Sequence, residues 1–396
     1  MPSEGISRDP DSMAVRDLRR WQAEALELWQ RQSNRGIVSV VTGGGKTIFA
    51  LACIERIRAT TTLVVVPTAA LLDQWWEETS AFFGMPLEDV NVLTGSRQMK
   101  SGTINLAVLN TAARLPEASG LPECFLIIDE CHRAAAPSFR KVLDLKKSAS
   151  LGLSATPGRQ YDDGLDQILV PAIGPVIYTY SYADALRDTV IVPFVLRNVV
   201  FELEAEAKSE YEKLTRSIAR CAQQEGPESQ KTIALLLRRA RVSNLSANRV
   251  RIAARIVAAN RGRRILVFHE DIRACEVIGE VLAGNGVRAG VYHSRLALRT
   301  RAGILADFRV GRLEVLVTCR ALDEGFNVPE TEIGIVAAST ATTRQRIQRL
   351  GRILRPAAGK SAAIIYTLAA TVSEVARLKE EESVLTGVAT ATWGRA

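Results

Sequence analysis

The sequence predicts an α/β protein with two tandem, doubly wound parallel-sheet domains and a short helical insert between them. Short apolar runs alternate with helix-like segments in both halves of the 396-residue chain, and the stretch between the halves has few such runs. Each half is about the size of one such domain. We therefore expect a loose N-terminal tail at 1–16, a first domain at 17–200, the insert at 201–260 and a second domain at 261–396.

The composition is that of an ordinary globular protein, with 47% hydrophobic and 24% charged residues. A formal net charge of +8, from 51 basic and 43 acidic residues, favours a polyanionic partner such as nucleic acid. The six cysteines show no C-x-x-C spacing, so we expect reduced thiols rather than a zinc site or a disulfide framework. No apolar signal core or bilayer-length run is present, so we expect no membrane partner and a cytoplasmic protein.

Ten apolar runs have the length and composition of buried strands in parallel sheets. In the first half they are Ile37–Val41, Leu63–Val66, Ile104–Leu109, Phe125–Ile128 and Ser150–Leu153. In the second half they are Ile265–Phe268, Val287–Tyr292, Val315–Thr318, Ile333–Ala337 and Ala362–Tyr366. The insert is rich in Ala, Glu, Arg and Leu, and we expect two helices joined by a turn at 224–229.

A glycine-rich turn lies between the first predicted strand and a helix-like segment at 48–58. Its sequence is Thr42-Gly43-Gly44-Gly45-Lys46-Thr47, a pattern in which backbone N–H groups cradle phosphates. We expect Lys46 to reach the β and γ phosphates of ATP and the Thr47 hydroxyl to ligate Mg²⁺. The generic phosphate-binding pattern has a glycine at the position of Val40, so this sequence departs from the generic pattern there. A turn without a ligand is the alternative, but it does not account for a Lys-Thr pair between a strand and a helix.

Two carboxylates end the fourth predicted strand, in Leu126-Ile127-Ile128-Asp129-Glu130-Cys131-His132. We expect Asp129 to hold Mg²⁺ opposite Thr47, directly or through water. Glu130 is then placed to orient and deprotonate the attacking water. An Asp-Glu pair at a strand end is common and by itself indicates no site. This pair indicates a nucleotide-hydrolysing site because it follows a phosphate-binding turn within the same domain.

These motifs resemble those of the superfamily 2 helicases, in the DExH branch, through Asp129-Glu130-Cys131-His132. The resemblance covers roughly residues 17–368 and implies two RecA-like domains with ATP hydrolysed at their interface. Ser154-Ala155-Thr156-Pro157 is similar to motif III, which implies that Ser154 and Thr156 couple the metal site to that interface. Leu18-Arg19-Arg20-Trp21-Gln22 resembles the adenine-reading element, which implies that Gln22 and Arg19 contact the base.

The resemblance also implies a row of contacts to the phosphates of a nucleic-acid strand. The segment 67–75 resembles motif Ia, with Thr68 as its contact, and we interpret Trp75 and Trp76 as packing residues rather than base-stacking ones. The other implied contacts are Thr94, Gly95, Asn110, Thr111, Ser294 and Thr318. Hydroxyl and amide contacts of this kind grip the backbone without reading bases.

Two further stretches of the second half resemble motifs V and VI. The first, 323–329, implies nucleotide contacts for Asp323 and Gly325, and it carries Asn327 where many relatives have Asp. The second, 345–355, implies that Arg352 and Arg355 are arginine fingers and that Gln348 is a polar contact near the γ-phosphate. A basic helix on a solvated face is the alternative for motif VI.

The resemblance implies an ATP-dependent helicase or translocase similar to the XPB/Ssl2 and ResIII group, with ATP and Mg²⁺ as cofactors and DNA favoured over RNA. One alternative is a motor subunit of a repair, restriction or defence complex that moves on duplex without unwinding it. An ATP-clamped scaffold and a small-molecule P-loop kinase are two others. The helical insert is expected to brace a domain or to dock a protein partner.

Overall fold

The computed structural model describes residues 18–94, 98–115, 120–155, 163–319, 328, 331–338, 353–357 and 359–396. The chain passes from one compact unit to a second between Tyr180 and Ser181. Within the described residues, no helix is long and apolar enough to cross a membrane. Two seven-stranded sheets, one in each unit, are parallel throughout, which confirms the predicted fold class.

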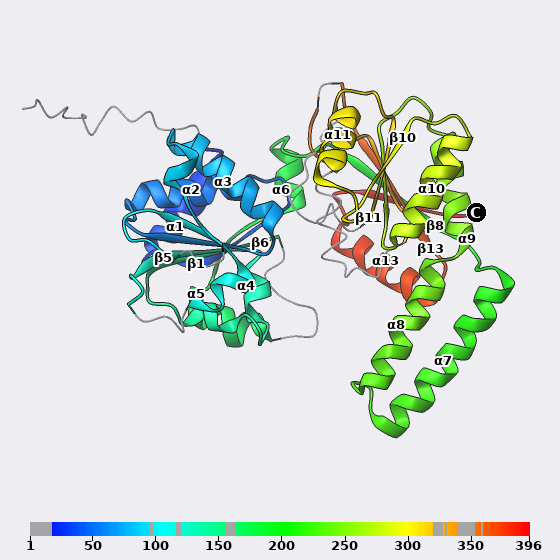
Figure 1. Ribbon diagram of the computed structural model, residues 1–396, viewed down its shortest axis with the longest axis horizontal. Coiled ribbons are helices and arrows are strands. Elements are labelled where there is room, and N and C mark those ends of the chain that lie inside the picture. The colour runs from blue at the N-terminus through cyan, green and yellow to red at the C-terminus, as the bar shows by residue number, and fades with distance from the viewer. Residues whose placement is uncertain are drawn as a thin grey trace, which may run out of the picture. The chain divides into compact units, whose positions relative to one another are not determined.

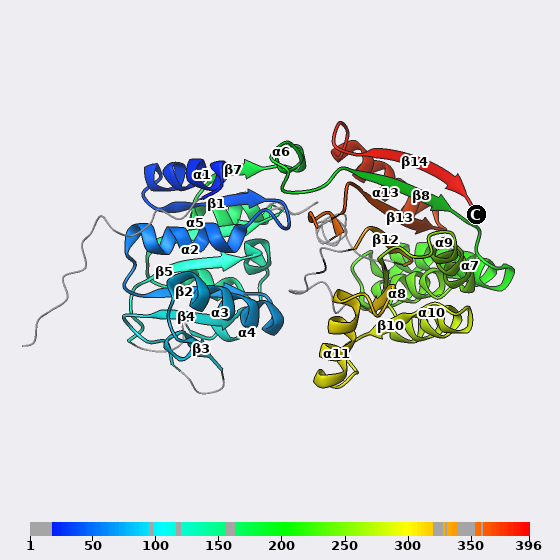
Figure 2. The ribbon, with the colours of Figure 1, turned by 90° about the horizontal axis from the view of Figure 1, so that it is seen from above.

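The first sheet has the strand order β3-β4-β2-β5-β6-β1-β7 (Figure 2). Its strands are β1 (Arg35–Val40), β2 (Thr62–Val66), β3 (Asn91–Leu93), β4 (Ile104–Val108), β5 (Cys124–Asp129), β6 (Lys147–Ser154) and β7 (Val176–Tyr180). Every residue of β2 and β5 is buried, as expected for central strands covered on both faces.

Helices cover both faces of this sheet (Figure 1). On one face lie α1 (Arg20–Arg31), α2 (Lys46–Ile57) and α3 (Ala69–Phe83). The other face carries α4 (Leu109–Ala112), α5 (Val170–Ile173) and short helical turns at Cys131–Ala135, Arg140–Asp144 and Leu165–Leu169. A further turn, Leu87–Asp89, follows α3.

The second sheet has the strand order β10-β11-β9-β12-β13-β8-β14. Its strands are β8 (Phe194–Val200), β9 (Ile265–His269), β10 (Ala289–Tyr292), β11 (Val315–Cys319), β12 (Ile333–Val336), β13 (Ala363–Ala369) and β14 (Thr390–Arg395). The helices of this unit are α6 (Tyr182–Arg187), α7 (Ala205–Glu225), α8 (Gln230–Asn244), α9 (Ala247–Ala258), α10 (Ile272–Gly284), α11 (Leu298–Arg309) and α13 (Val372–Val384).

All ten predicted strands are present, and four others, β3, β7, β8 and β14, were not predicted. None of the four is a long continuous apolar run. β14 is almost wholly exposed at a sheet edge, β7 at the edge of the other sheet has only one buried residue, and β8 alternates between buried and less buried residues over most of its length. The apolar pattern that identifies doubly covered strands therefore does not identify them.

The division of the chain differs from the expected boundary at residue 200. The strand β8, which lies within the expected first domain, pairs in parallel with β13 and β14 of the second sheet. From Ser181 onwards the chain accordingly belongs to the second unit. A strand in the linker carries no local mark of the sheet it will join, because only hydrogen-bond pairing decides that.

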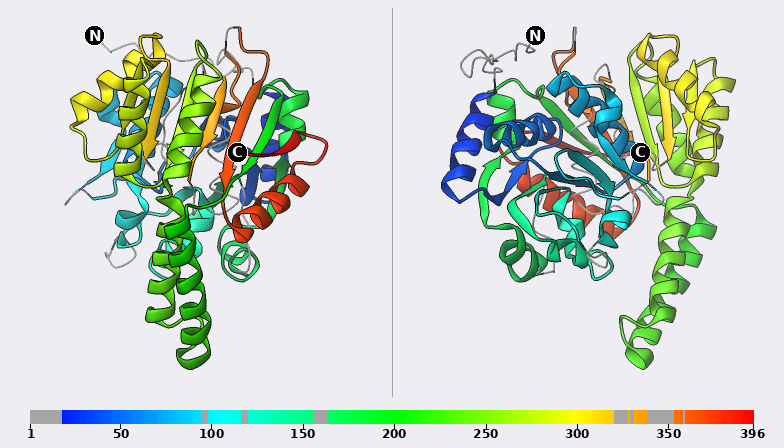
Figure 3. Two further views of the ribbon diagram at one scale, coloured as in Figure 1. Left: turned by 90° about the vertical axis from the view of Figure 1, so that its right-hand side faces the viewer. Right: turned by 60° about the vertical axis from the view of Figure 1, so that its left-hand side comes forward.

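The insert contains three helices rather than the two expected. The helices α7 and α8 form a hairpin that packs chiefly on itself and extends from the second sheet (Figure 3). Its turn at 226–229 falls where the sequence predicted it. The third helix, α9, packs on α10, and its residues Ile252, Ala253 and Val257 lie in the core of the second unit. The helix α9 therefore attaches the hairpin to the second unit.

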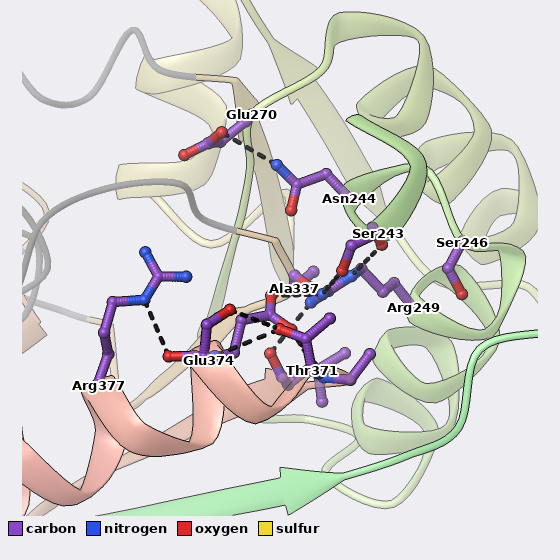
Figure 4. A network of polar contacts seen from close by, with 12 residues as sticks. Ser243, Asn244, Ser246, Arg249, Glu270, Ala337, Thr371, Glu374 and Arg377 are labelled. Atoms are coloured by element: carbon purple, nitrogen blue, oxygen red, sulfur yellow. Dashed lines mark hydrogen bonds and ion pairs between the residues drawn. The ribbon is translucent and has the colours of Figure 1, made fainter. Parts of the chain in front are cut away.

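A fully buried arginine of α9 connects this helix to its neighbours in the second unit (Figure 4). Arg249 of α9 is 0% exposed and donates from Nε to the Ser243 carbonyl, from Nη1 to the carbonyls of Ala337 and Leu368, and from Nη2 to Ser243 Oγ and Glu374 Oε1. All five N–H groups of the guanidinium are thus used. The second Glu374 oxygen accepts from Thr371 at the start of α13. One side chain thereby joins α8, α9, α13 and the ends of two strands.

Replacing Arg249 by methionine is expected to lower the free energy of unfolding of the second unit by about 3–5 kcal/mol, because the buried Glu374 carboxylate loses its ionic partner. Denaturant titration followed by circular dichroism measures this change. Arg251→Met, at an exposed position of the same helix, is the control and should change stability by less than about 0.5 kcal/mol. Equal stability of the two variants would contradict the assigned role.

Candidate active site

Three of the predicted motifs lie at the carboxyl ends of neighbouring strands in the first sheet. The strands β5, β6 and β1 are neighbours and run parallel, so their carboxyl ends lie at the same edge. The glycine-rich turn follows β1, Asp129 ends β5, and Ser154 ends β6. Segments far apart in the sequence are therefore brought together by strand order.

The glycine-rich turn has the backbone that a phosphate cradle needs. Gly43 and Gly45 have φ angles of 85° and 99°, in the left-handed region that favours glycine. A Cβ at Gly45 would also lie 2.9 Å from Gln22 Nε2. The helix α2 begins at Lys46, directly after Gly45. Its first N–H groups have no partner within the helix, so they can donate to an anion held by the turn.

The predicted adenine-reading residues lie beside this turn. Gln22 is 3% exposed and donates from Nε2 to the Gly45 carbonyl over 3.0 Å. Its Oε1 accepts from the Arg19 backbone N–H over 2.8 Å. Gln22 therefore fixes the start of α1 to the turn, and its contact with a base stays a prediction.

Lys46 and Glu130 form an ion pair at the centre of the site. The Lys46 Nζ lies 2.8 Å from Glu130 Oε1, and the two side chains are only 12% and 13% exposed. Burial lowers the pKa of Lys46, but the carboxylates of Glu130 and Asp129 outweigh this effect and leave that pKa raised. The ammonium group therefore stays charged at neutral pH. Glu130 itself has a φ angle of 50°, which is uncommon for a residue with a side chain.

Both oxygens of the Asp129 carboxylate are engaged by hydrogen-bond donors. The Trp75 indole N–H donates to Oδ2 over 3.0 Å, and the Glu130 backbone N–H donates to Oδ1 over 3.0 Å. Asp129 is 7% exposed, and burial raises its pKa, although the nearby Lys46 ammonium opposes this effect. Each oxygen keeps a further lone pair, so the carboxylate can still ligate a cation.

A second set of contacts links Glu130 to the end of β6. The His132 Nδ1 lies 3.1 Å from Ser154 Oγ, and this hydroxyl lies 3.4 Å from Glu130 Oε2. His132 and Ser154 are both buried. The predicted coupling residue Ser154 thus contacts the carboxylate that is expected to activate water.

The donor set fits a magnesium nucleotide. Asp129 and the hydroxyl of Thr47, the second residue of α2, offer the hard oxygen ligands that Mg²⁺ prefers, with phosphate oxygens and water completing its shell. Within the described ranges, no three His, Cys, Asp or Glu residues are grouped to hold a metal without such help. In the turn, Thr42 Oγ1 is buried without a hydrogen-bond partner among these residues, so it can still donate to a phosphate oxygen.

Two family models match the chain. The model described as "Type III restriction enzyme, res subunit" matches residues 16–159, and the model described as "Helicase conserved C-terminal domain" matches residues 248–357. The first match includes the turn and the β5 carboxylates, and the second includes β9 to β12.

Similar proteins include a "DNA 3'-5' translocase XPB2" of Sulfurisphaera tokodaii, 29% identical over 86% of this chain and 79% of that protein. Proteins named "DNA 3'-5' helicase XPB" from Kineococcus radiotolerans and Mycobacterium tuberculosis are 27% and 26% identical. They match 89% and 92% of this chain, which spans only 59% and 62% of their lengths. The chain therefore resembles the superfamily 2 helicases of the XPB and ResIII group, as predicted. That resemblance implies the use of ATP and the binding of nucleic acid.

Two solved structures agree with this fold. The "ATP-dependent Type ISP restriction-modification enzyme LlaBIII bound to DNA" has a TM-score of 0.66 at 15% identity and covers 96% of this chain and 31% of that one. The structure "S. cerevisiae Dbp5 bound to RNA and ADP BeF3" has a TM-score of 0.60 at 14% identity and covers 94% and 89%. At these identities the likeness concerns the RecA-like fold alone.

The residues that were expected to contact nucleic acid differ in their exposure. Thr68 caps α3, where its Oγ1 accepts from the Leu71 N–H over 3.4 Å, and Thr94 and Asn110 are exposed. Thr111 lies half-buried in α4, and Ser294 is exposed after β10. Thr318 differs, because it is 0% exposed within β11 and its hydroxyl has no partner among the described residues. A phosphate contact by Thr318 would require its surroundings to open.

Several predicted site residues lie outside the described residues: Gly95, Thr156, Asp323, Gly325, Gln348 and Arg352. Arg355 is described, directly after the buried Ile353 and Leu354, and is itself half-buried. The roles assigned to these residues remain predictions.

The sequence did not reveal the contacts of two side chains in the candidate active site. We had interpreted Trp75 as a packing residue, and it is fully buried, but its indole N–H also holds Asp129. The family resemblance includes His132 but assigns it no role of its own. Local sequence gives no signal for the first contact, because its partners are 54 residues apart.

Proposed function

We propose that this chain is an ATP-dependent DNA translocase or helicase that hydrolyses ATP bound to the turn at 42–47. The Lys46–Glu130 pair beside Asp129 supports this proposal most directly, because it places a phosphate-binding cation, a candidate base and a candidate metal ligand within one buried site. A scaffold that only clamps ATP would not need Glu130 at this position.

Hydrolysis at this site requires Lys46 to exchange partners. In the structure its ammonium group is held by Glu130. Triphosphate in the glycine turn would draw Lys46 towards the β and γ phosphates and release the Glu130 carboxylate. Glu130 could then accept a proton from the attacking water, while Ser154 and His132 hold its second oxygen. Mg²⁺, held by Asp129 and Thr47, would neutralise the developing phosphate charge.

The second unit is proposed to complete the site with arginines. Arg352 and Arg355 would stabilise the charge on the transferred phosphoryl group, and Gln348 would lie near it. ATP would then favour closure of the two units and hydrolysis would favour their opening, while Thr68, Thr111 and Thr318 grip the strand in turn.

DNA is favoured over RNA as the track, because several relatives are named DNA helicases or translocases. The net charge of +8 suits either nucleic acid. A motor subunit that acts with protein partners is the second candidate, with the α7–α8 hairpin as the surface that would dock a partner.

An ATPase screen over single-stranded DNA, duplex, forked DNA and RNA tests the proposal. We expect one or more DNA ligands to stimulate phosphate release, and we expect this stimulation to weaken as salt rises, because binding releases counterions from phosphates. Strand displacement on the best ligand separates unwinding from duplex translocation. Phosphate release that no nucleic acid changes, but that a small metabolite does, would favour a P-loop kinase instead.

A further inference from the structure

The indole of Trp75 links the helix α3 to the candidate metal ligand. Trp75 is 0% exposed and Asp129 is 7% exposed, and the N–H to Oδ2 distance is 3.0 Å. An indole N–H can only donate, so this contact holds the oxygen in its acceptor role and fixes the carboxylate plane. Partners of this kind orient a metal ligand without touching the metal.

The same helix begins at a predicted nucleic-acid contact. The helix α3 follows β2, and β2 is the parallel neighbour of β5 with Val65 opposite Ile128, so α3 starts beside the end of β5 (Figure 2). Thr68 caps its first turn by accepting from the Leu71 N–H, which leaves the hydroxyl proton available to a phosphate oxygen. Trp75 lies seven residues, or about 10 Å, further along the helix axis.

The helix α3 is one continuous helix of 15 residues. It packs on α2 and on the strands β2 and β4. The neighbouring Trp76 donates its indole N–H to the Leu87 carbonyl over 2.7 Å, away from Asp129. Since Thr68 caps this helix and Trp75 lies within it, we expect a displacement of the first turn to shift Trp75 as well.

We propose that Trp75 is a positioning residue for Asp129, and that α3 transmits nucleic-acid contact at Thr68 to the metal ligand through this hydrogen bond. The inference rests on the proposed ATPase function and names one route by which nucleic acid stimulates it. The two tryptophans of α3 offer a matched pair for the test, since each makes one indole hydrogen bond and only one of them reaches the site.

The test compares Trp75→Phe with Trp76→Phe in the full chain. Binding of a fluorescent ADP is titrated against Mg²⁺, and phosphate release is measured with and without the stimulating DNA. For Trp75→Phe we expect the Mg²⁺ concentration at half-maximal ADP binding to rise by about 10- to 100-fold, and the ratio of stimulated to basal rate to fall. Trp76→Phe should retain the parent values for both.

Parent-like Mg²⁺ dependence in a folded Trp75→Phe protein would overturn the positioning role. Raised Mg²⁺ dependence with an unchanged stimulation ratio would overturn transmission through α3. If Trp75→Phe does not fold, benzothienylalanine at position 75 replaces the indole N–H by sulfur at nearly the same shape, and the same two readouts decide. A parent protein that neither binds Mg·ADP nor responds to DNA would contradict the proposed function instead.

Discussion

Glu130→Gln is expected to lower ATP turnover by about 100- to 10,000-fold, because the amide cannot accept the proton of the attacking water. Binding of ATP should be retained or strengthened. In the structure Glu130 holds Lys46 at 2.8 Å, and this pair competes with the phosphates for the ammonium group. Removing the carboxylate charge weakens that competition. Phosphate release and equilibrium binding of a fluorescent ATP analogue, measured on the same preparation, check both expectations.

Glu123→Gln is the matched control for this experiment. Glu123 is exposed and directly precedes β5, the strand that Asp129 ends. It should keep the parent rate and the parent affinity. Turnover by Glu130→Gln at the parent rate would show that Glu130 is not the base, and weaker ATP binding would show that the ion pair does not restrain Lys46.

Lys46→Ala is expected to weaken ATP binding and also to slow ATP hydrolysis. Loss of the charge-assisted contact to the phosphates should raise the ATP dissociation constant by about 10- to 100-fold. Turnover at saturating ATP should fall by about 100- to 1,000-fold, because the developing charge on the phosphates loses a preorganised cation. Glu130→Gln, in contrast, should keep its affinity for ATP. We expect this difference between the two variants because Lys46 contacts the phosphates whereas Glu130 competes with them for Lys46.

Lys100→Ala, at an exposed position before β4, controls for the loss of one positive charge from the first unit. Nucleotide-stabilised melting gives an independent readout, since a given concentration of ATP should raise the melting temperature of the parent and of Glu130→Gln by more than that of Lys46→Ala. A Lys46→Ala protein that ATP stabilises as well as the parent would contradict the assigned role of the lysine.

The local sequence was sufficient to predict those parts of the site whose residues are contiguous in the chain. The turn at 42–47 and the carboxylates after β5 each carry their chemistry within a few residues, because strand, turn and helix follow one another there. The ten predicted strands were identified for a similar reason, since strands covered on both faces are continuous apolar runs. β8 and β14 lack that pattern, and their place in the second sheet became visible only through their pairing.

The sequence by itself determined the fold class, the phosphate-binding turn and the residue types of a hydrolytic site. Tertiary structure alone decided which of those residues meet. The Lys46–Glu130 pair joins positions 84 apart, Trp75 reaches Asp129 across 54 positions, and Arg249 reaches Glu374 across 125. The physical reason is that strand order and helix packing set such distances, and both depend on hydrogen bonds and buried contacts between segments that no local pattern specifies.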